Sequence, residues 1–334
     1  MACLLSKRGV DKMYVIGIDG GGTKTTGIIA TYKGEVVAKA TVGGTNINST
    51  GKKAVQAELE KLVTNLKESA PDDFKQVKRV FAGMAGAGNT SNQEALKTML
   101  LSLFPSGVNI NIDHDAITAL YSGTIGRPGI VQIAGTGAIT YGVNQIFERA
   151  RVGGWGHLFG DQGSGYAIGR DALEEAFKAR DGITKPTLLC ELLTKHFGKD
   201  ELPDIIPNIY QSENPKKLIS SLTMLVLEAV QQDDITAKKI IQKNGAELGI
   251  AISTLVSQLF TQGDEAIPVV LVGGLFSRYD ILKESIEQTI KEKGVRVEMI
   301  FPKILPAGGA VVAALLEEKV DIDEFFLETF NRTN

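Results

Sequence analysis

The sequence predicts an α/β protein with two lobes, and three observations carry that prediction. The chain has 334 residues, which is long for a single hydrophobic core and suits two domains. Short β-branched runs alternate with segments of helical periodicity in both halves. A glycine–threonine loop occurs twice, each time between two apolar β-branched runs. The repeat predicts that both lobes open with a similar β-hairpin.

The first lobe is expected at residues 13–117, and it opens with three short runs that favour a meander of strands. The predicted elements, in chain order, are strands at 14–18, 26–32 and 35–40, a helix at 52–69, a strand at 77–82, a helix at 91–103, a strand at 108–112 and a helix at 116–122. We expect a hinge between the lobes near residues 116–123.

The second lobe is expected at residues 118–307 and restarts with the repeated hairpin. The predicted elements are strands at 129–134, 138–143 and 149–152, a helix at 166–179, a mainly helical stretch at 187–262, a strand at 269–272, a helix at 279–293 and a strand at 296–301. A last helix at about 308–322 is rich in small residues, and we expect it to pack back on the first lobe.

Composition and charge argue against several classes of function. The formal net charge of −3 gives no reason to expect nucleic acid, whose binding needs a concentrated basic surface. The two cysteines, Cys3 and Cys190, are too few for a disulfide framework or a cysteine zinc site. No apolar stretch approaches the roughly 20 residues of a membrane helix, and residues 1–12 lack a signal-peptide core. We therefore expect a cytoplasmic protein that binds neither membrane nor nucleic acid.

The first glycine–threonine loop follows a predicted strand and reads Gly20-Gly21-Gly22-Thr23-Lys24. It is not a Walker A motif, because Thr23 stands where that motif has lysine and the next residues resemble a strand. A glycine hairpin of this kind can point backbone N–H groups at phosphate oxygens. Asp19 precedes the glycines, and a carboxylate beside phosphates requires a cation, so Asp19 predicts bound Mg²⁺. The alternative is a turn whose glycines serve backbone geometry alone.

The second loop, Gly135-Thr136-Gly137, offers similar N–H donors without a preceding carboxylate. Two such hairpins are typical of two arms that bind one polyphosphate, which favours a nucleotide-dependent phosphotransferase. Gly273-Gly274 follows a buried apolar strand, and a glycine pair allows close backbone approach to a flat adenine or its ribose. Together the three segments predict a site for an adenine nucleotide.

Asp115 is the candidate catalytic base. It follows the predicted strand at 108–112, and ligands of open α/β sheets bind beyond the carboxyl ends of strands. Phosphoryl transfer to a sugar hydroxyl needs a carboxylate that orients the hydroxyl and accepts its proton. The alternative is that one of the two acids, Asp113 or Asp115, caps the helix that follows. We favour the cap or another local role for Asp113 and catalysis for Asp115.

A glycine-dense segment at 153–169 contains Trp155, the one tryptophan of the chain. A ring flanked by glycines has no bulky sequence neighbours to bury it, so Trp155 is expected to line a sugar pocket, and Asp161 to bond a sugar hydroxyl or a metal-bound water. The alternative is a glycine-rich connection with Trp155 packed inward. His114 and His157 lack a third ligand at a metal-site spacing, so we expect local hydrogen bonds for both.

Taken in order, these motifs resemble the superfamily of sugar kinases, heat-shock chaperones and actin. The match comprises residues 19–23 as first phosphate loop, 134–137 as second loop and 272–274 as adenosine motif. Residues 153–164 are similar to the BadF-type branch, which contains N-acetylglucosamine kinase. The resemblance covers about residues 14–320. It implies two ribonuclease-H-like, actin-like ATPase lobes with a central interlobe cleft, the cofactors ATP and Mg²⁺, and phosphorylation of an amino sugar, typically at its 6-hydroxyl.

Carried over by position, the resemblance implies that Asp115 is the base. The sugar-contacting residues that it implies are Thr45, Asn46, Trp155, Gly156 and Asp161. Trp155 and Gly156 match the wall near the N-acetyl group. Gln162 stands where the family usually has glutamate, so kinases for glucosamine or N-acetylmuramic acid remain open alternatives.

The resemblance also brings a homodimer as an expectation and three competing functions. An ATPase that activates a dehydratase needs a cysteine-held iron–sulfur cluster, which Cys3 and Cys190 are poorly suited to supply. A non-catalytic sugar sensor would not require Asp115. A peptide-binding chaperone would need a β-rich substrate domain after residue 320. A sugar kinase is therefore the favoured function.

Overall fold

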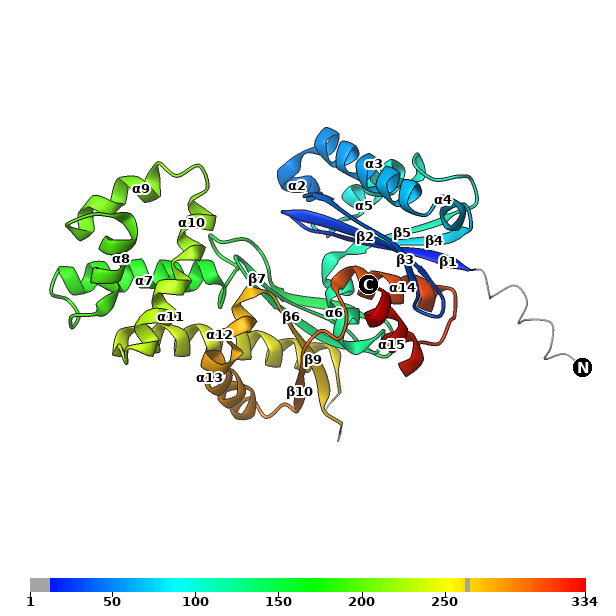
Figure 1. Ribbon diagram of the computed structural model, residues 1–334. Coiled ribbons are helices and arrows are strands. Elements are labelled where there is room, and N and C mark those ends of the chain that lie inside the picture. Colours follow the sequence, from blue (N-terminus) through cyan, green and yellow to red (C-terminus); the bar gives the residue numbers. More distant parts are fainter. Residues whose placement is uncertain (1–12, 262–264) are drawn as a thin grey trace, which may run out of the picture. The chain divides into compact units, whose positions relative to one another are not determined.

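The computed structural model describes residues 13–261 and 265–334. The expectations for residues 1–12 and for Cys3 lie outside that range. The described residues form two compact units (Figure 1). Unit 1 runs to Arg127 and resumes at Phe301, and unit 2 is Pro128–Ile300. Each unit is built on its own five-stranded sheet.

The sheet of unit 1 confirms the predicted opening hairpin. Its strands are β1 (Tyr14–Gly20), β2 (Lys24–Thr31), β3 (Val36–Gly43), β4 (Val77–Met84) and β5 (Asn109–His114). They lie in the order β3-β2-β1-β4-β5, in which the meander β1–β3 is antiparallel and β4 and β5 run parallel to β1. Three parallel strands therefore end at one edge of this sheet, and that edge carries the first glycine loop.

Helices cover both faces of this sheet (Figure 1). They are α2 (Ile47–Thr50), α3 (Lys52–Ser69), α4 (Pro71–Phe74), α5 (Thr90–Leu101), α6 (Asp115–Thr124), α14 (Pro306–Glu317) and α15 (Glu324–Thr333). The apolar residues of α3 recur at helical spacing and are buried against one face. On the other face α14 lies against β1 and α6. A side chain at Gly17 would overlap the backbone of α14, and one at Gly309 would overlap that of α6.

The end of unit 1 differs from the domain boundary expected at residues 117–118. That position falls inside α6, whose residues 116–124 are all buried. The helix ends only at Ile125, which takes the left-handed conformation with φ of 54°. Because α6 is packed against α14 along its length, it belongs wholly to unit 1. The contact of α14 with α6 and β1 likewise places this small-residue helix in unit 1.

The sheet of unit 2 repeats the topology of the first. Its strands are β6 (Gly129–Ala134), β7 (Ala138–Val143), β8 (Arg149–Gly153), β9 (Ile267–Val272) and β10 (Val297–Ile300). They lie in the order β10-β9-β6-β7-β8, with β6–β8 antiparallel and β9 and β10 parallel to β6. The second glycine loop and the Gly273-Gly274 pair therefore meet at one edge of this sheet.

Between β8 and β9 the chain is helical, as the periodicity predicts. The elements are α7 (Gly165–Arg180), α8 (Leu188–Phe197), the 3₁₀ turn η1 (Leu202–Ile205), α9 (Ile206–Tyr210), α10 (Pro215–Ser221), α11 (Thr223–Gln231) and α12 (Ile235–Leu259), and after β9 come the 3₁₀ turn η2 (Gly274–Arg278) and α13 (Tyr279–Glu292). α7 to α11 gather away from the sheet, whereas α12 packs on it (Figure 1).

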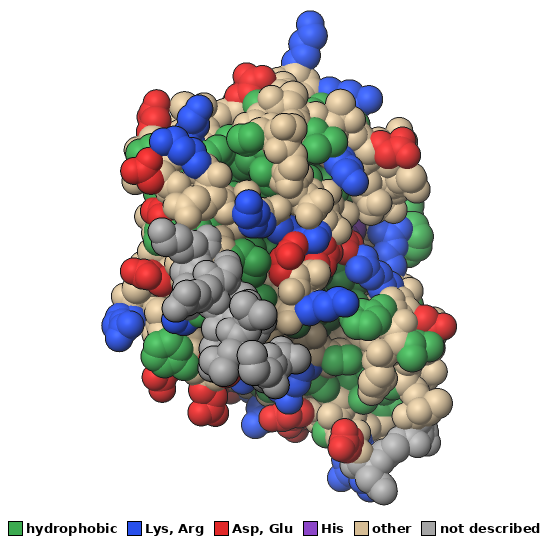
Figure 2. Space-filling model, turned by 90° about the vertical axis from the view of Figure 1, so that its right-hand side faces the viewer, with side chains coloured by type: hydrophobic (Ala, Val, Ile, Leu, Met, Phe, Trp, Pro, Cys, Tyr) green, Lys and Arg blue, Asp and Glu red, His purple; other side chains and the backbone are tan. Residues whose placement is uncertain are grey.

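The surface agrees with a chain of small net charge. Basic and acidic side chains are interspersed with hydrophobic ones on the face shown in Figure 2. Among the described helices, none combines the length and the hydropathy that a membrane-spanning segment requires.

Candidate active site

Unit 1 carries candidate site residues at the carboxyl edge of its sheet. The parallel register places Gly20 opposite Met84, and Met84 opposite His114. Asp19, Gly83 and Asp113 lie one residue earlier in the same three strands. Acidic residues that are far apart in sequence thus come to one edge, where open α/β sheets bind their ligands.

The first glycine loop is a tight hairpin between two antiparallel strands. The Gly21 N–H donates a hydrogen bond to the Lys24 carbonyl over 3.0 Å, and Gly22, Thr23 and Lys24 are exposed. A helix does not follow the turn, so the loop is not a Walker A motif, as predicted. Its exposed backbone leaves N–H groups available to an anion.

The segment Gly44–Thr45 packs against this loop and is hydrogen-bonded to it. The Thr45 N–H donates to the Gly21 carbonyl at 3.0 Å, and a side chain at Gly44 would overlap the Gly22 carbonyl. Thr45 is fully buried, and its hydroxyl lies 2.8 Å from that of Thr25. Thr45 therefore supports the loop in this structure, and its hydroxyl is not presented to a ligand.

Asn46 lies next to Thr45 and is partly exposed. Its side-chain oxygen accepts a hydrogen bond from the Asn48 N–H at 3.0 Å and so caps α2. A side chain at Gly86 would come within 2.7 Å of that oxygen. The amide nitrogen of Asn46 is the group left to meet a ligand.

Asp19 is held by a residue that the sequence analysis did not identify. The Thr118 hydroxyl donates a 2.7 Å hydrogen bond to Asp19 Oδ1 and also lies 2.7 Å from the Asp115 carbonyl. A side chain at Gly83 would overlap Thr118, so that glycine lets α6 approach the sheet. Asp115 and Thr118 share a helix face at a spacing of three, a signal that could have identified Thr118.

Burial raises the pKa of Asp19 to about 6. The hydrogen bond from Thr118 acts in the opposite direction, the charge of Asp115 raises the pKa further, and Lys24 lowers it. A carboxylate that is desolvated beside another carboxylate gains from a bound cation. One such carboxylate, with phosphates and water, is the ligand set that Mg²⁺ uses in phosphate sites, so Asp19 fits the metal expected there.

Asp115 is the first residue of α6, and it does not cap the helix. The N-cap is His114, whose Nδ1 lies 3.1 Å from the Ala116 nitrogen and 2.8 Å from Asp115 Oδ1. Asp113 is buried, and its Oδ1 accepts a hydrogen bond from the His114 N–H at 2.7 Å. Asp113 thus has a local role other than the cap, and the partly exposed Asp115 carboxylate is available for chemistry.

Unit 2 carries candidate site residues of its own at the corresponding edge of its sheet. The Gly135 N–H donates to the Gly137 carbonyl over 2.9 Å, and the Gly135 carbonyl accepts from the N–H of Gly165 at 2.8 Å. Thr136 is exposed at the tip. Gly273 has a φ of 115°, and a side chain there would overlap the Ala134 carbonyl. The loop and the predicted adenosine motif are therefore in contact.

Asp161 lies beside this second loop and forms an ion pair with a lysine. Its Oδ2 is 3.1 Å from the ammonium of Lys216 on α10. A side chain at Gly137 would come within 2.8 Å of the same Oδ2, so the carboxylate occupies the space that this glycine leaves. Sequence analysis missed Lys216, because it lies within a helical stretch and no motif or spacing distinguishes it from the neighbouring Lys217.

The Trp155 side chain is 59% exposed, so the alternative of an inward-packed tryptophan is wrong. The guanidinium of Arg151 stacks over its ring, 3.7 Å from the ring centre. The loop is closed by hydrogen bonds from Gly154 N–H to the Gly160 carbonyl and from Gly160 N–H to that of Gly156, at 2.9 and 2.8 Å. This short closed loop presents an aromatic face to solvent.

Gln162, the departure from the family pattern, is an exposed residue of the same loop. Its side chain is exposed and donates a 3.3 Å hydrogen bond to the Phe159 carbonyl, whereas Asp161 is buried. His157 packs edge-on against Tyr166, at 5.0 Å between ring centres. Among residues 13–261 and 265–334, no group of three or more His, Cys, Asp or Glu side chains could hold a metal by itself.

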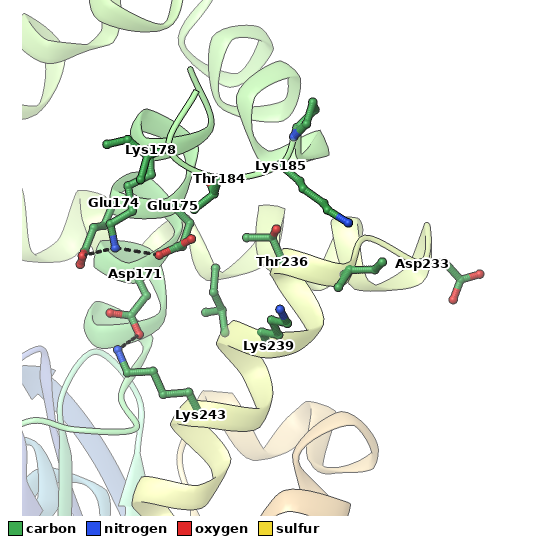
Figure 3. Close-up of a pocket in the computed structure, with 14 residues that line it drawn as sticks. Asp171, Glu174, Glu175, Lys178, Thr184, Lys185, Asp233, Thr236, Lys239 and Lys243 are labelled. Atoms are coloured by element: carbon green, nitrogen blue, oxygen red, sulfur yellow. Dashed lines mark hydrogen bonds and ion pairs between the residues drawn. The ribbon is translucent and has the colours of Figure 1, made fainter. Parts of the chain in front are cut away.

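Unit 2 contains a cavity of about 810 Å³, and Figure 3 shows the residues that line it. It is bounded by α7, the segment after it and α12, and its charges are largely paired. Lys178 contacts Glu174 and Glu175 at 2.7 and 2.9 Å, and Lys243 contacts Asp171 at 2.9 Å. None of the predicted site residues lines this cavity.

Comparison with known proteins agrees with the motifs. Residues 16–315 match the model of the BadF/BadG/BcrA/BcrD ATPase family. An N-acetylmuramic acid/N-acetylglucosamine kinase of Clostridium acetobutylicum is 34% identical, over 91% of this chain and 99% of the relative. An N-acetyl-D-glucosamine kinase of Dictyostelium discoideum is 31% identical, over 93% of this chain and 100% of the relative.

The fold is also found among solved structures. A protein of Chromobacterium violaceum superposes with a TM-score of 0.70 at 24% identity, over 90% of this chain and 98% of that one. The likeness supports the α/β ATPase fold of two lobes that the motifs predict. Because residues 16–315 of this chain match the family model, the chain belongs to the BadF/BadG/BcrA/BcrD ATPase family.

Proposed function

We propose that this protein is an ATP-dependent sugar kinase that phosphorylates an amino sugar, with N-acetylglucosamine as the first candidate and its 6-hydroxyl as the acceptor. The observation that carries the proposal lies within unit 1. The same helix, α6, presents the Asp115 carboxylate and the Thr118 hydroxyl that holds Asp19 beside the first glycine loop. One helix thus holds both the proposed base for the acceptor hydroxyl and the acid proposed to act beside the phosphates. The kinase activity named for both curated relatives supports the same reaction.

Each unit contributes groups to nucleotide binding in this proposal. The backbone N–H groups of both glycine loops, with the Thr23 and Thr136 hydroxyls and Lys24, bind phosphate oxygens. Gly273-Gly274 lies against the base or ribose of the nucleotide. Asp19 would hold Mg²⁺, largely through water, and Mg²⁺ supplies charge neutralisation to the phosphates.

Asp115 orients the acceptor hydroxyl and accepts its proton as the phosphoryl group is transferred. His114 Nδ1 accepts the hydrogen bond from the Ala116 N–H and lies 2.8 Å from Asp115 Oδ1. As the N-cap, His114 fixes the start of α6, the helix that begins with Asp115. His114 is therefore a positioning residue, and Asp115 is the catalytic one.

The sugar is proposed to contact Asn46, Gly156 and Asp161, and its N-acetyl group to contact the Trp155 ring. The exposed aromatic face of Trp155 suits the apolar side of a substituted sugar. Thr45 contributes indirectly, since its hydroxyl is bonded to Thr25. The Gln162 side chain is exposed and hydrogen-bonded to the Phe159 carbonyl, so kinases for glucosamine or N-acetylmuramic acid stay open alternatives.

A coupled assay of ADP release tests this proposal. Purified protein is given Mg²⁺ and ATP with N-acetylglucosamine, N-acetylmuramic acid, glucosamine, N-acetylmannosamine or glucose in separate reactions. We expect the largest stimulation from N-acetylglucosamine, with the phosphate at the 6-position by NMR. A clear preference for N-acetylmuramic acid or glucosamine would change the substrate that we propose but not the reaction. ATP turnover that no sugar stimulates would overturn it.

A further inference from the structure

We propose that Lys216 of α10 is a phosphate-binding residue of the second glycine loop, where it supplies the positive charge that the loop lacks. The inference rests on the proposed use of ATP, and it assigns a ligand contact to a helix that carries none of the motifs. The ligand is the terminal part of a nucleoside triphosphate.

The position of the Lys216 ammonium is the first argument. It lies 3.1 Å from Asp161 Oδ2, and that oxygen is the one that Gly137 leaves room for. The Asp161 side chain is 6% exposed, whereas that of Lys216 is 35% exposed. The ammonium is thus anchored on one side by a buried acid and open to solvent on the other. With three N–H donors it can contact Asp161 and a phosphate oxygen together.

Electrostatics supply the second argument. The second loop offers neutral N–H and hydroxyl donors, and the negative charge of Asp161 beside it opposes the binding of a phosphate. Lys216 neutralises that carboxylate in the free protein. A phosphate at Gly135–Gly137 would meet the exposed side of the same ammonium, where a charge-assisted hydrogen bond is stronger than a neutral one.

The packing of α10 is the third argument, because it holds Lys216 in place. α10 lies across the start of α7 at two glycines one helical turn apart. A side chain at Gly169 would overlap the Ile219 carbonyl, and one at Gly165 would come within 2.7 Å of Ser220 Oγ. Small residues at this spacing let two helices approach closely, so α10 has a defined position against α7.

The first residue of α7 is also hydrogen-bonded to the second glycine loop. The Gly165 N–H donates to the Gly135 carbonyl at 2.8 Å, and the Thr223 hydroxyl donates to the Gly165 carbonyl at 2.9 Å. Loop, α7 and the segment that carries Lys216 are therefore joined by direct contacts within unit 2. A lysine fixed in this way is part of a built site, unlike one on a freely exposed helix face.

The test compares Lys216→Met with Lys217→Met, a matched control on the same helix whose side chain is exposed. Isothermal titration calorimetry measures the affinities of ATP and AMP without sugar, and steady-state assays give the KM of the sugar. We expect Lys216→Met to weaken ATP binding at least tenfold, to leave AMP within twofold and to leave the sugar KM within twofold. Lys217→Met should match the wild type. Lys216→Arg should recover part of the ATP affinity.

Asp161→Asn provides a second variant whose expected effect on ATP has the opposite sign. Removing the carboxylate frees the ammonium, so ATP affinity should stay equal or rise, whatever happens to the sugar. Circular dichroism checks that each variant is folded. If Lys216→Met does not fold, loss of ATP affinity in Asp161→Asn would itself overturn the inference.

Three results would contradict the assignment of Lys216. An unchanged ATP affinity with a raised sugar KM would mean that Lys216 only orients Asp161. If neither the ATP affinity nor the sugar KM changes, the Lys216–Asp161 contact is an ion pair with no role in ligand binding. If the wild-type protein binds no ATP, the ligand proposed for Lys216 is wrong. If ATP affinity depends on Lys216 but no sugar is phosphorylated, the inference stands and the kinase proposal fails.

Discussion

The two glycine loops share a fold but differ in how charge is balanced beside them. Each lies at the carboxyl edge of a five-stranded sheet with the same strand order, and each is followed by an antiparallel strand. Beside the first loop Asp19 has a threonine hydroxyl as its partner, whereas beside the second loop Asp161 has a lysine ammonium. The same topology thus supports one acid that is paired with a neutral hydroxyl and another that is paired with an ammonium.

In our proposal the two edges have different tasks. The acids of unit 1 hold a metal and accept a proton, because neither Asp19 nor Asp115 is neutralised by a neighbouring lysine or arginine within hydrogen-bond distance among the described residues. The Asp161–Lys216 pair of unit 2 is neutral overall, and we propose that it positions phosphate or sugar. Each of the following predictions alters one side of this comparison.

The largest effect is expected for Asp115→Ala. Loss of the base should reduce kcat by about 10²–10⁴-fold, the usual range for general base catalysis. ATP binding should be nearly unchanged, because no loop group is removed. Single-turnover kinetics and calorimetry measure the two quantities. A variant that retains most of its activity would show that another residue is the base.

Asp19→Asn should make the metal-free protein more stable at high pH. The folded-state pKa of Asp19 is raised from 3.8 to about 6, so its contribution to stability is fully present below pH 3.8 and is lost as the pH rises through 6. Since one pKa unit corresponds to about 1.4 kcal/mol, the variant should gain roughly 3 kcal/mol at pH 8 and about half of that at pH 5.

Urea unfolding with EDTA at both pH values measures this gain. The same variant should lose Mg²⁺-dependent activity, so stability and function move in opposite directions. An equal change in the free energy of unfolding at pH 5 and pH 8 would show that burial does not raise the pKa of Asp19.

Each loop region has one glycine at which an added side chain would be crowded and one at which it would not. A side chain at Gly20 would come within 2.6 Å of Met84 and Thr45, and one at Gly137 within 2.8 Å of Asp161, whereas Gly22 and Gly135 face open space. Alanine at the crowded positions should lower the free energy of unfolding by about 1–3 kcal/mol, because of overpacking. Alanine at the open positions should change it by less than about 0.5 kcal/mol. Chemical denaturation of the four variants checks the pattern, and equal losses would refute it.

Thr118→Val removes the hydroxyl that holds Asp19 but keeps the shape of the side chain. Groups that orient a metal ligand typically contribute at least tenfold to affinity, so the Mg²⁺ concentration for half-maximal activity should rise about tenfold. Thr118→Ser retains the hydroxyl and should remain close to the wild type. The idea is wrong if serine and valine behave alike.

Much of this arrangement could be predicted from the sequence because it depends on local patterns. The β-branched runs and glycine turns predict both hairpins, and the position of Asp115 after a strand predicts its place at the sheet edge. The motifs also predict the family correctly.

The remainder depends on contacts between segments that are distant in sequence. Thr118 reaches Asp19 only because Gly83 lets α6 approach the sheet, and Lys216 reaches Asp161 only because α10 packs on α7. The expected boundary at residues 117–118 failed to match the structure for a similar reason, since α6 continues to Thr124 against α14. Such packing has no local signature.

The most direct test of the difference between the loops is the affinity for ATP measured by calorimetry with Mg²⁺ and with EDTA, in the wild type, Asp19→Asn and Lys216→Met. Asp19→Asn should abolish the gain in affinity that Mg²⁺ provides and leave the value in EDTA unchanged or improved. Lys216→Met should weaken ATP binding by a similar factor in both conditions. If both variants lose only the Mg²⁺-dependent part, or neither changes ATP affinity, the two edges do not divide their roles in the way proposed.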